Sequence, residues 1–178
     1  MQVQSVQAQQ RRASIPAEPV IPSVRGEFYS YSSEFSIGRP LCYLFKCKSN
    51  KSRPLEEAER IDHEIDLVFV FGNEIRVCSP NTAPSVAMLG DMVSGDLGHT
   101  LIARSGITED EFYRLRQQKD GDAIAKVCRE VVARAEGIVA LSPGTILTVT
   151  TESGKYGLLL VKEITESSIK VDACHILL

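Results

Sequence analysis

The chain has 178 residues, of which 43% are hydrophobic and 24% charged, and its formal net charge is −3. These values are ordinary for a globular protein, and they allow one domain with a sizeable core, or one domain with an appendage. No apolar run approaches the ~18 residues that a membrane-spanning helix needs, and the first residues lack the apolar segment of a secretory signal. We therefore expect a cytoplasmic protein without membrane association.

The five cysteines and the glycine pattern exclude several classes of site. The cysteines are odd in number, widely spread and free of any Cys-x-x-Cys pair. This distribution favours reduced, buried thiols over a disulfide framework. Neither a Gly-x-x-x-x-Gly-Lys nor a Gly-x-Gly-x-x-Gly phosphate-binding motif is present. We therefore expect no cofactor.

Charge is divided unevenly along the chain. Residues 1–54 contain eight basic and three acidic residues, a net charge of +5, whereas the remainder contains twelve basic and twenty acidic residues, a net charge of −8. Residues 1–23 are rich in glutamine, interrupted by prolines and poor in large apolar side chains, so ordering them gains little burial. We predict a flexible N-terminal arm over residues 1–23 and a single globular domain over residues 24–178. A basic arm on an acidic body is typical of an interaction tail, or of a tail that folds back on its own body.

A short motif lies within this arm. Residues 11–16 read Arg-Arg-Ala-Ser-Ile-Pro, which resembles a substrate site of basophilic protein kinases and the phosphoserine motif bound by 14-3-3 proteins. The resemblance implies phosphorylation of Ser14, with Arg11 and Arg12 as the basic determinants. A phosphate there adds charge that an arginine cluster can bind.

Residues 27–35 and 41–48 have the aromatic and apolar content of β-strands, and residues 36–38 form a turn signal between them. We predict that they pair as a first hairpin. The basic loop that follows contains Lys46, Lys48, Lys51 and Arg53. Aromatic residues interleaved with lysine suit single-stranded nucleic acid. The alternative is a sheet with core aromatics and a solvated rim, its charge neutralised by the acidic residues that follow.

The most strongly patterned stretch is residues 65–77. Residues 65–71 are a nearly continuous run of apolar residues, which predicts a strand covered on both faces. Gly72 and Asn73 are a two-residue turn signal, and residues 74–77 alternate as a returning strand does. Residues 63–69 with Gly72 also resemble the strand that carries the metal-binding aspartate, here Asp66, of restriction-endonuclease-like nucleases. The Glu-x-Lys pair of that family is missing, because Ser-Pro-Asn stands at residues 79–81.

Residues 90–99 form the most enzyme-like loop. Asp91, Asp96 and His99 could ligate a metal ion, or Ser94 and His99 could act as nucleophile and base. The spacing matches no established motif. The same residue types are common in plain connecting loops, which is the alternative interpretation.

Two helices are expected next, over residues 107–118 and 122–136. Thr108 and Glu111 form a capping box at the start of the first helix, and Asp122 can cap the second helix. Residues 145–151, 156–164 and 169–177 read as three strands with short turns, hence an antiparallel meander. The alternation of residues 169–174 predicts that one face of the last strand is solvated. The predicted fold class is α+β, an antiparallel β-sheet with a helical pair and a C-terminal three-stranded meander.

No catalytic constellation accompanies the charge asymmetry. The leading hypothesis is a non-catalytic structural or protein-interaction module that presents its basic, flexible arm to a protein partner. The alternatives are a metal-dependent hydrolase that uses the 91–99 loop, with Asp66 as a further ligand, and a nucleic-acid-binding protein that uses the basic loop.

Overall fold

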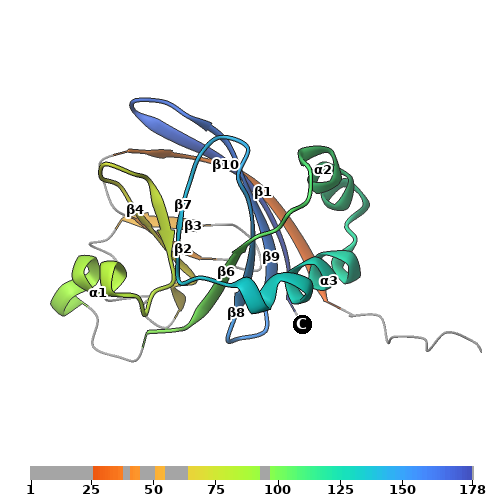
Figure 1. Ribbon diagram of the computed structural model, residues 1–178, viewed down its shortest axis with the longest axis horizontal. Coiled ribbons are helices and arrows are strands. Elements are labelled where there is room, and N and C mark those ends of the chain that lie inside the picture. Colours follow the sequence, from red (N-terminus) through yellow and green to blue (C-terminus); the bar gives the residue numbers. More distant parts are fainter. Residues whose placement is uncertain (1–25, 38–40, 45–50, 55–63, 93–96, 178) are drawn as a thin grey trace, which may run out of the picture.

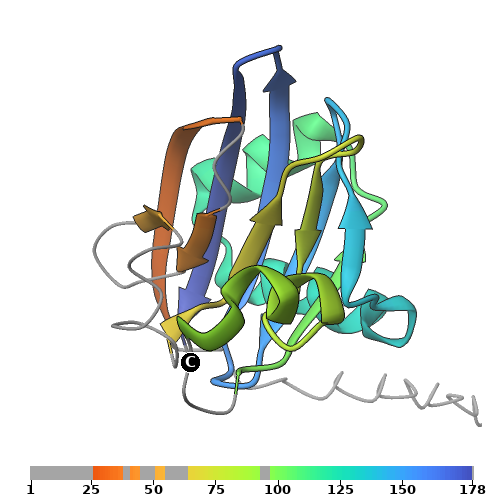
Figure 2. The same ribbon diagram turned by 90° about the vertical axis from the view of Figure 1, so that its left-hand side faces the viewer.

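Two antiparallel sheets lie face to face, and a helical layer covers the outer face of each of them (Figures 1 and 2). This is a computed structural model, and it describes residues 26–37, 41–44, 51–54, 64–92 and 97–177. The strand orders are β1-β10-β9-β8-β6 and β3-β2-β4-β5-β7. The predicted α+β class is therefore confirmed. None of the helices in the described ranges combines the length and apolar character needed to cross a membrane.

The first sheet is built around the predicted C-terminal meander, which is confirmed. Its strands are β8 (Ile146–Thr151), β9 (Tyr156–Ile164) and β10 (Ser168–Leu177), each antiparallel to the next. The short turns between them force this arrangement, because a parallel neighbour needs a long crossover. Strand β6 (Thr100–Arg104) extends the sheet beside β8, and β1 (Glu27–Ser36) extends it beside β10.

The predicted first hairpin is wrong. Strand β1 pairs with β10 along its whole length, from Glu27 opposite Leu177 to Ser36 opposite Ser168. Strand β2 (Leu41–Leu44) belongs to the other sheet, where it pairs with β3 (Lys51–Pro54) and β4 (Leu67–Val70). The ten-residue β10 offers β1 a much longer antiparallel ladder than four-residue β2 does, and nothing in the local turn sequence encodes that choice.

The second sheet also contains β5 (Arg76–Cys78) and β7 (Ile138–Ala140). All four residues of β4 are buried, as the continuous apolar run predicts. The hairpin between β4 and β5 is confirmed, but its connection is longer than the predicted two residues, because Val70 lies opposite Arg76. Phe71 and Ile75 leave that ladder and pack against the core between the sheets.

Three hydrophobic clusters separate the four layers. The largest fills the space between the sheets and includes Leu67 and Phe69 of β4. The other face of β4, with Val68 and Val70, packs against Leu89 of α1 (Ala83–Leu89). The third cluster lies between the first sheet and the helices α2 (Glu109–Gln118) and α3 (Gly121–Val131). Figure 1 shows α1 on one side of the strands and the α2–α3 pair on the other.

The helical pair is confirmed, with both boundaries of the second helix corrected. Thr108 caps α2 as predicted, since its side chain accepts the N–H of Glu111. Helix α3 begins earlier than predicted, because Asp120 and not Asp122 is its cap, with Oδ1 accepting the N–H of Ala123 at 2.9 Å. It ends at Val131 and continues as a single 3₁₀ turn, η4 (Val132–Arg134).

The predicted solvated face of the last strand is wrong for most of its length. Asp172 and Cys174 of β10 are buried, because α2 and α3 cover this face. Only Lys170, nearer the turn, is exposed as expected. The sequence pattern of alternating polar residues is the same for a solvated face and for one that buries a paired charge.

Candidate functional site

Asp172 lies at the centre of a polar cluster between α2 and the first sheet. The Asp172 cluster comprises five side chains: Ser32 of β1, Tyr113 and Arg116 of α2, Lys162 of β9, and Asp172 of β10. Tyr113 donates a hydrogen bond to Asp172 Oδ2 at 2.7 Å, and Arg116 Nη1 lies 3.1 Å from the same oxygen. Lys162 Nζ donates to Tyr113 Oη at 2.7 Å. Arg116 Nη2 also donates to Ser32 Oγ at 3.2 Å, so one guanidinium contacts two strands.

The electrostatics of the Asp172 cluster favour a charged Asp172 carboxylate and a neutral Tyr113 phenol. Burial opposes the charge of Asp172, but hydrogen bonds from Ser32 and Tyr113 and the charges of Arg116 and Lys162 outweigh it, so the pKa of Asp172 is lowered. Burial raises the pKa of Tyr113. A lowered carboxyl pKa gives a stable anion, and a raised phenol pKa gives a stable proton donor. The cluster therefore joins α2 to the sheet through a charged carboxylate that accepts from Tyr113 and pairs with Arg116.

An open hollow of about 370 Å³ lies beside this cluster, over β1, β9 and β10. Its charged side chains are already paired. Lys170 Nζ lies 2.6 Å from Glu163 Oε2, and Ser168 Oγ donates to Glu34 Oε1 at 2.8 Å. The lining contains two acidic side chains, Glu34 and Asp172, and two basic ones, Lys162 and Lys170, so the hollow favours no single ligand charge.

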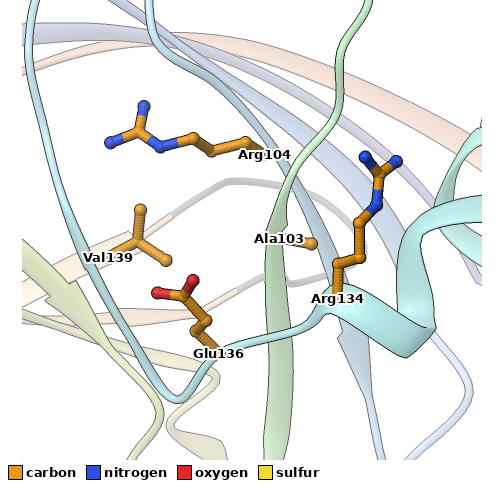
Figure 3. Close-up of a pocket in the computed structure, with 5 residues that line it drawn as sticks. All are labelled: Ala103, Arg104, Arg134, Glu136 and Val139. Atoms are coloured by element: carbon orange, nitrogen blue, oxygen red, sulfur yellow. The ribbon is translucent and has the colours of Figure 1, made fainter.

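A smaller cavity of about 190 Å³ lies where the outer strands of the two sheets meet (Figure 3). We call it the seam pocket, and it is lined by Ala103 and Arg104 of β6, Arg134 of η4, Glu136, and Val139 of β7. Figure 3 shows Arg104 and Glu136 reaching into the gap beside Val139, and Arg134 rising beyond the β6 ribbon. Arg104 Nη2 donates to the carbonyl oxygen of Ala140 at 2.9 Å, which fixes that guanidinium across the gap.

Asp66, the residue of the nuclease-like resemblance, is engaged in an ion pair. Lys155 Nζ lies 2.9 Å from Oδ2 and 3.2 Å from Oδ1 of Asp66, and the carboxylate is almost fully buried. The pair joins the residue just before β4, in the second sheet, to the turn between β8 and β9, in the first sheet. Both carboxylate oxygens are thus occupied by an ammonium group in this arrangement.

The three residues of the metal-site hypothesis are not all placed. Asp91 is exposed in the 3₁₀ turn η3 (Gly90–Met92), His99 is exposed just before β6, and Asp96 lies outside the described residues. Among the residues that the structure describes, no three His, Cys, Asp or Glu side chains are grouped as metal ligands. The hydrolase hypothesis stays a prediction.

The residues of the arm and basic-loop hypotheses lie mostly outside the described part of the chain. This holds for Arg11, Arg12 and Ser14 of the arm and for Lys46 and Lys48 of the basic loop. Lys51 and Arg53 are residues of β3, an outer strand of the second sheet, and not of an irregular loop as predicted. Arm binding, phosphorylation and nucleic-acid binding stay predictions.

The thiols that the structure describes are buried, as the cysteine pattern predicts: Cys78, Cys128 and Cys174. Burial raises the pKa of both Cys128 and Cys174 to about 12. Because the thiolate is the reactive form, these two side chains are poor nucleophiles at neutral pH.

Sequence reasoning missed both polar sites. In the Asp172 cluster, one signal was available: Lys162 and Asp172 are charges inside long apolar strands, and a buried charge requires a partner. The seam pocket gave no comparable signal, since Arg104, Arg134 and Glu136 lie at or just after the ends of elements, where charged residues are common. No protein-family model matches this chain, and comparison with curated proteins and with solved structures yields no match.

Proposed function

We propose that this chain is a non-catalytic protein-interaction module, in which a two-sheet body carries a basic N-terminal arm to a protein partner. The observation that carries the proposal is the charge division, +5 over residues 1–54 against −8 over the remainder. The basic part comprises the arm, which contains Arg11 and Arg12 against Glu18, and the segment from residue 24 to the end of β3. Such an asymmetry increases the rate of encounter with a partner of opposite charge and suppresses wrong partners of like charge.

The chemistry of the described body supports a binding role. A general base needs a pKa near the working pH, and a nucleophile needs an activated form. Asp172 has a lowered pKa and several donors, Tyr113 a raised pKa, and Asp66 an ammonium partner. Each of these groups stabilises the contact between two layers. A role in holding layers together is consistent with a rigid body that supports binding.

The test is affinity capture from the native host with tagged full-length protein, read by mass spectrometry. The variant Arg11→Gln with Arg12→Gln removes two arm charges, and deletion of residues 1–23 removes the arm. We expect the partner to be lost from both. The matched control is Arg114→Gln with Lys126→Gln, two exposed basic residues of the helices whose ion pairs are solvent-exposed.

Equal capture by the wild type, the arm variants and the control would contradict the proposed role of the arm. Loss from the arm variants alone would support it. Phosphorylation of Ser14 places about two negative charges beside these arginines. We therefore expect a phosphorylated arm to lose an acidic partner, and capture with the protein phosphorylated at Ser14 measures this.

A further inference from the structure

The seam pocket lies where the outer strands of the two sheets come together. Strand β6 is the outer strand of one sheet and β7 that of the other. Among the residues that the structure describes, a single bridge outside the named strands joins the two edges, between Ile102 and Glu136, with N···O distances of 3.3 and 2.7 Å. Beyond the bridge the strands diverge, and the pocket fills the opening.

The backbone of Arg104 faces this opening. Along β6, alternate residues direct their N–H and C=O groups away from β8. Thr100 is the first of these, and its N–H is bound by Ser79 Oγ at 2.9 Å. Ile102 is the second and is bound by Glu136. Arg104 is the third in this series, so its N–H and C=O point away from β8, and the same residue lines the pocket.

The charge of the pocket favours an anion. Arg104 and Arg134 contribute two positive charges and Glu136 one negative charge. Arg134 is exposed and forms no ion pair with any residue in the described ranges. A guanidinium offers a planar fork of donors that fits a carboxylate with two parallel hydrogen bonds.

The size of the pocket limits what enters it. Its volume of about 190 Å³ is below the ~300 Å³ at which small-molecule sites begin, so it admits a side chain and not a whole cofactor. Ala103 and Val139 form the apolar part of the lining, which suits the methylene groups of a longer acidic side chain.

We propose that the seam pocket binds a glutamate side chain of an extended segment of the partner protein. The segment adds to the free edge of β6 through the N–H and C=O of Arg104, and its carboxylate pairs with the guanidinium of Arg134. Glu136 lines the same pocket, and its negative charge disfavours a segment that carries a further acidic side chain next to the bound glutamate. That the ligand is a protein segment rests on the proposed function; that the pocket selects a carboxylate rests on its own charges.

The probe is a short peptide, acetyl-Val-Glu-Val-amide, compared with acetyl-Val-Gln-Val-amide, which has the same shape without the charge. Each is titrated into ¹⁵N-labelled full-length protein, and amide chemical shifts are followed. With the glutamate peptide we expect saturable shifts of the protein's amides, confined to residues 102–105 and 134–140, with a Kd on the order of 1 mM. The glutamine peptide should bind at least about fivefold more weakly, because it lacks a charge-assisted hydrogen bond.

Three variants sharpen the test. Arg134→Gln should weaken glutamate-peptide binding at least about fivefold, because it removes a positive charge from the pocket. Glu136→Gln should strengthen binding, because it removes the negative charge. Lys126→Gln on α3 changes the net charge by the same amount as Arg134→Gln, away from the pocket, and should leave binding unchanged. Equal binding of both peptides, equal binding to Arg134→Gln, or shifts centred elsewhere would each overturn the proposal.

Failure of this inference is distinguishable from failure of the proposed function. In full-length protein with Arg11→Gln and Arg12→Gln, the glutamate peptide should still bind the pocket. Loss of its shifts in that variant assigns the peptide to the arm and overturns the pocket inference, while the capture experiment on the arm stands. If the peptide still binds the pocket while the arm variants capture the partner normally, the pocket inference is supported and the proposed role of the arm is contradicted.

Discussion

His175 provides a quantitative prediction for the pH dependence of stability. It lies in β10 with no exposed surface, and the rings of Tyr29 and Tyr31 of β1 stack against it at centroid distances of 5.3 and 5.7 Å. Burial, with a contribution from the charge of Lys155, lowers the pKa of His175 to about 4. Between that value and the ~6.5 of an unfolded chain, the unfolded state binds more protons than the folded state.

The contribution of neutral His175 to the free energy of unfolding is therefore fully present above about pH 7, and it is lost as the pH falls through this window. The pKa difference corresponds to a loss of about 1.4 kcal/mol between about pH 7.5 and pH 5.5, and to about 3 kcal/mol below both pKa values. Above about pH 5.5 most carboxylates remain ionised, so the first interval isolates the histidine.

The assay is urea unfolding at constant ionic strength across this interval. Wild type and His99→Gln, which removes an exposed histidine, should both lose about 1.4 kcal/mol. His175→Phe keeps an aromatic ring between the tyrosines but cannot titrate, so its free energy of unfolding should be nearly constant. A loss in His175→Phe as large as in wild type would refute the reasoning, whatever its absolute stability.

Other substitutions test the remaining features of the fold. Phe69→Ala, in the core between the sheets, should lower the free energy of unfolding by about 4 kcal/mol in urea titrations, and a loss below about 1 kcal/mol would contradict its central packing. Asp172→Asn removes the acceptor charge of the Asp172 cluster and should cost about 2 kcal/mol by the same measurement; an unchanged midpoint would mean that the cluster does not hold α2. Thr108→Ala should cost about 1 kcal/mol, since it removes the cap of α2, and Thr108→Ser should restore it. Thiol reagents at neutral pH should leave Cys128 and Cys174 unmodified in the folded protein, as mass spectrometry measures; rapid labelling would contradict their raised pKa.

The features that sequence reasoning predicted well depend on neighbours along the chain. The N-cap of α2 needs only the Thr108 side chain and the backbone N–H three residues on. The meander follows from short turns, which permit only antiparallel neighbours. The burial of β4 on both faces follows from a continuous apolar run, which no solvated strand tolerates.

The features that it missed join residues far apart in the chain. The partner of β1 is β10, a choice that depends on the length and burial of a strand near the other terminus. The Asp172 cluster draws on two strands of the meander, on α2 and on β1. A charge inside an apolar strand indicates that a partner is needed, but not which residue supplies it.

The amino-acid sequence by itself determined the helical pair, the meander, the covered strand and the uneven division of charge, because periodicity, caps and short turns act over a few residues. Only the tertiary structure decided which strands form each sheet, where the sheet edges meet and which charges border the seam pocket. These depend on how the layers pack around a common core, which burial of apolar surface drives without regard to sequence distance.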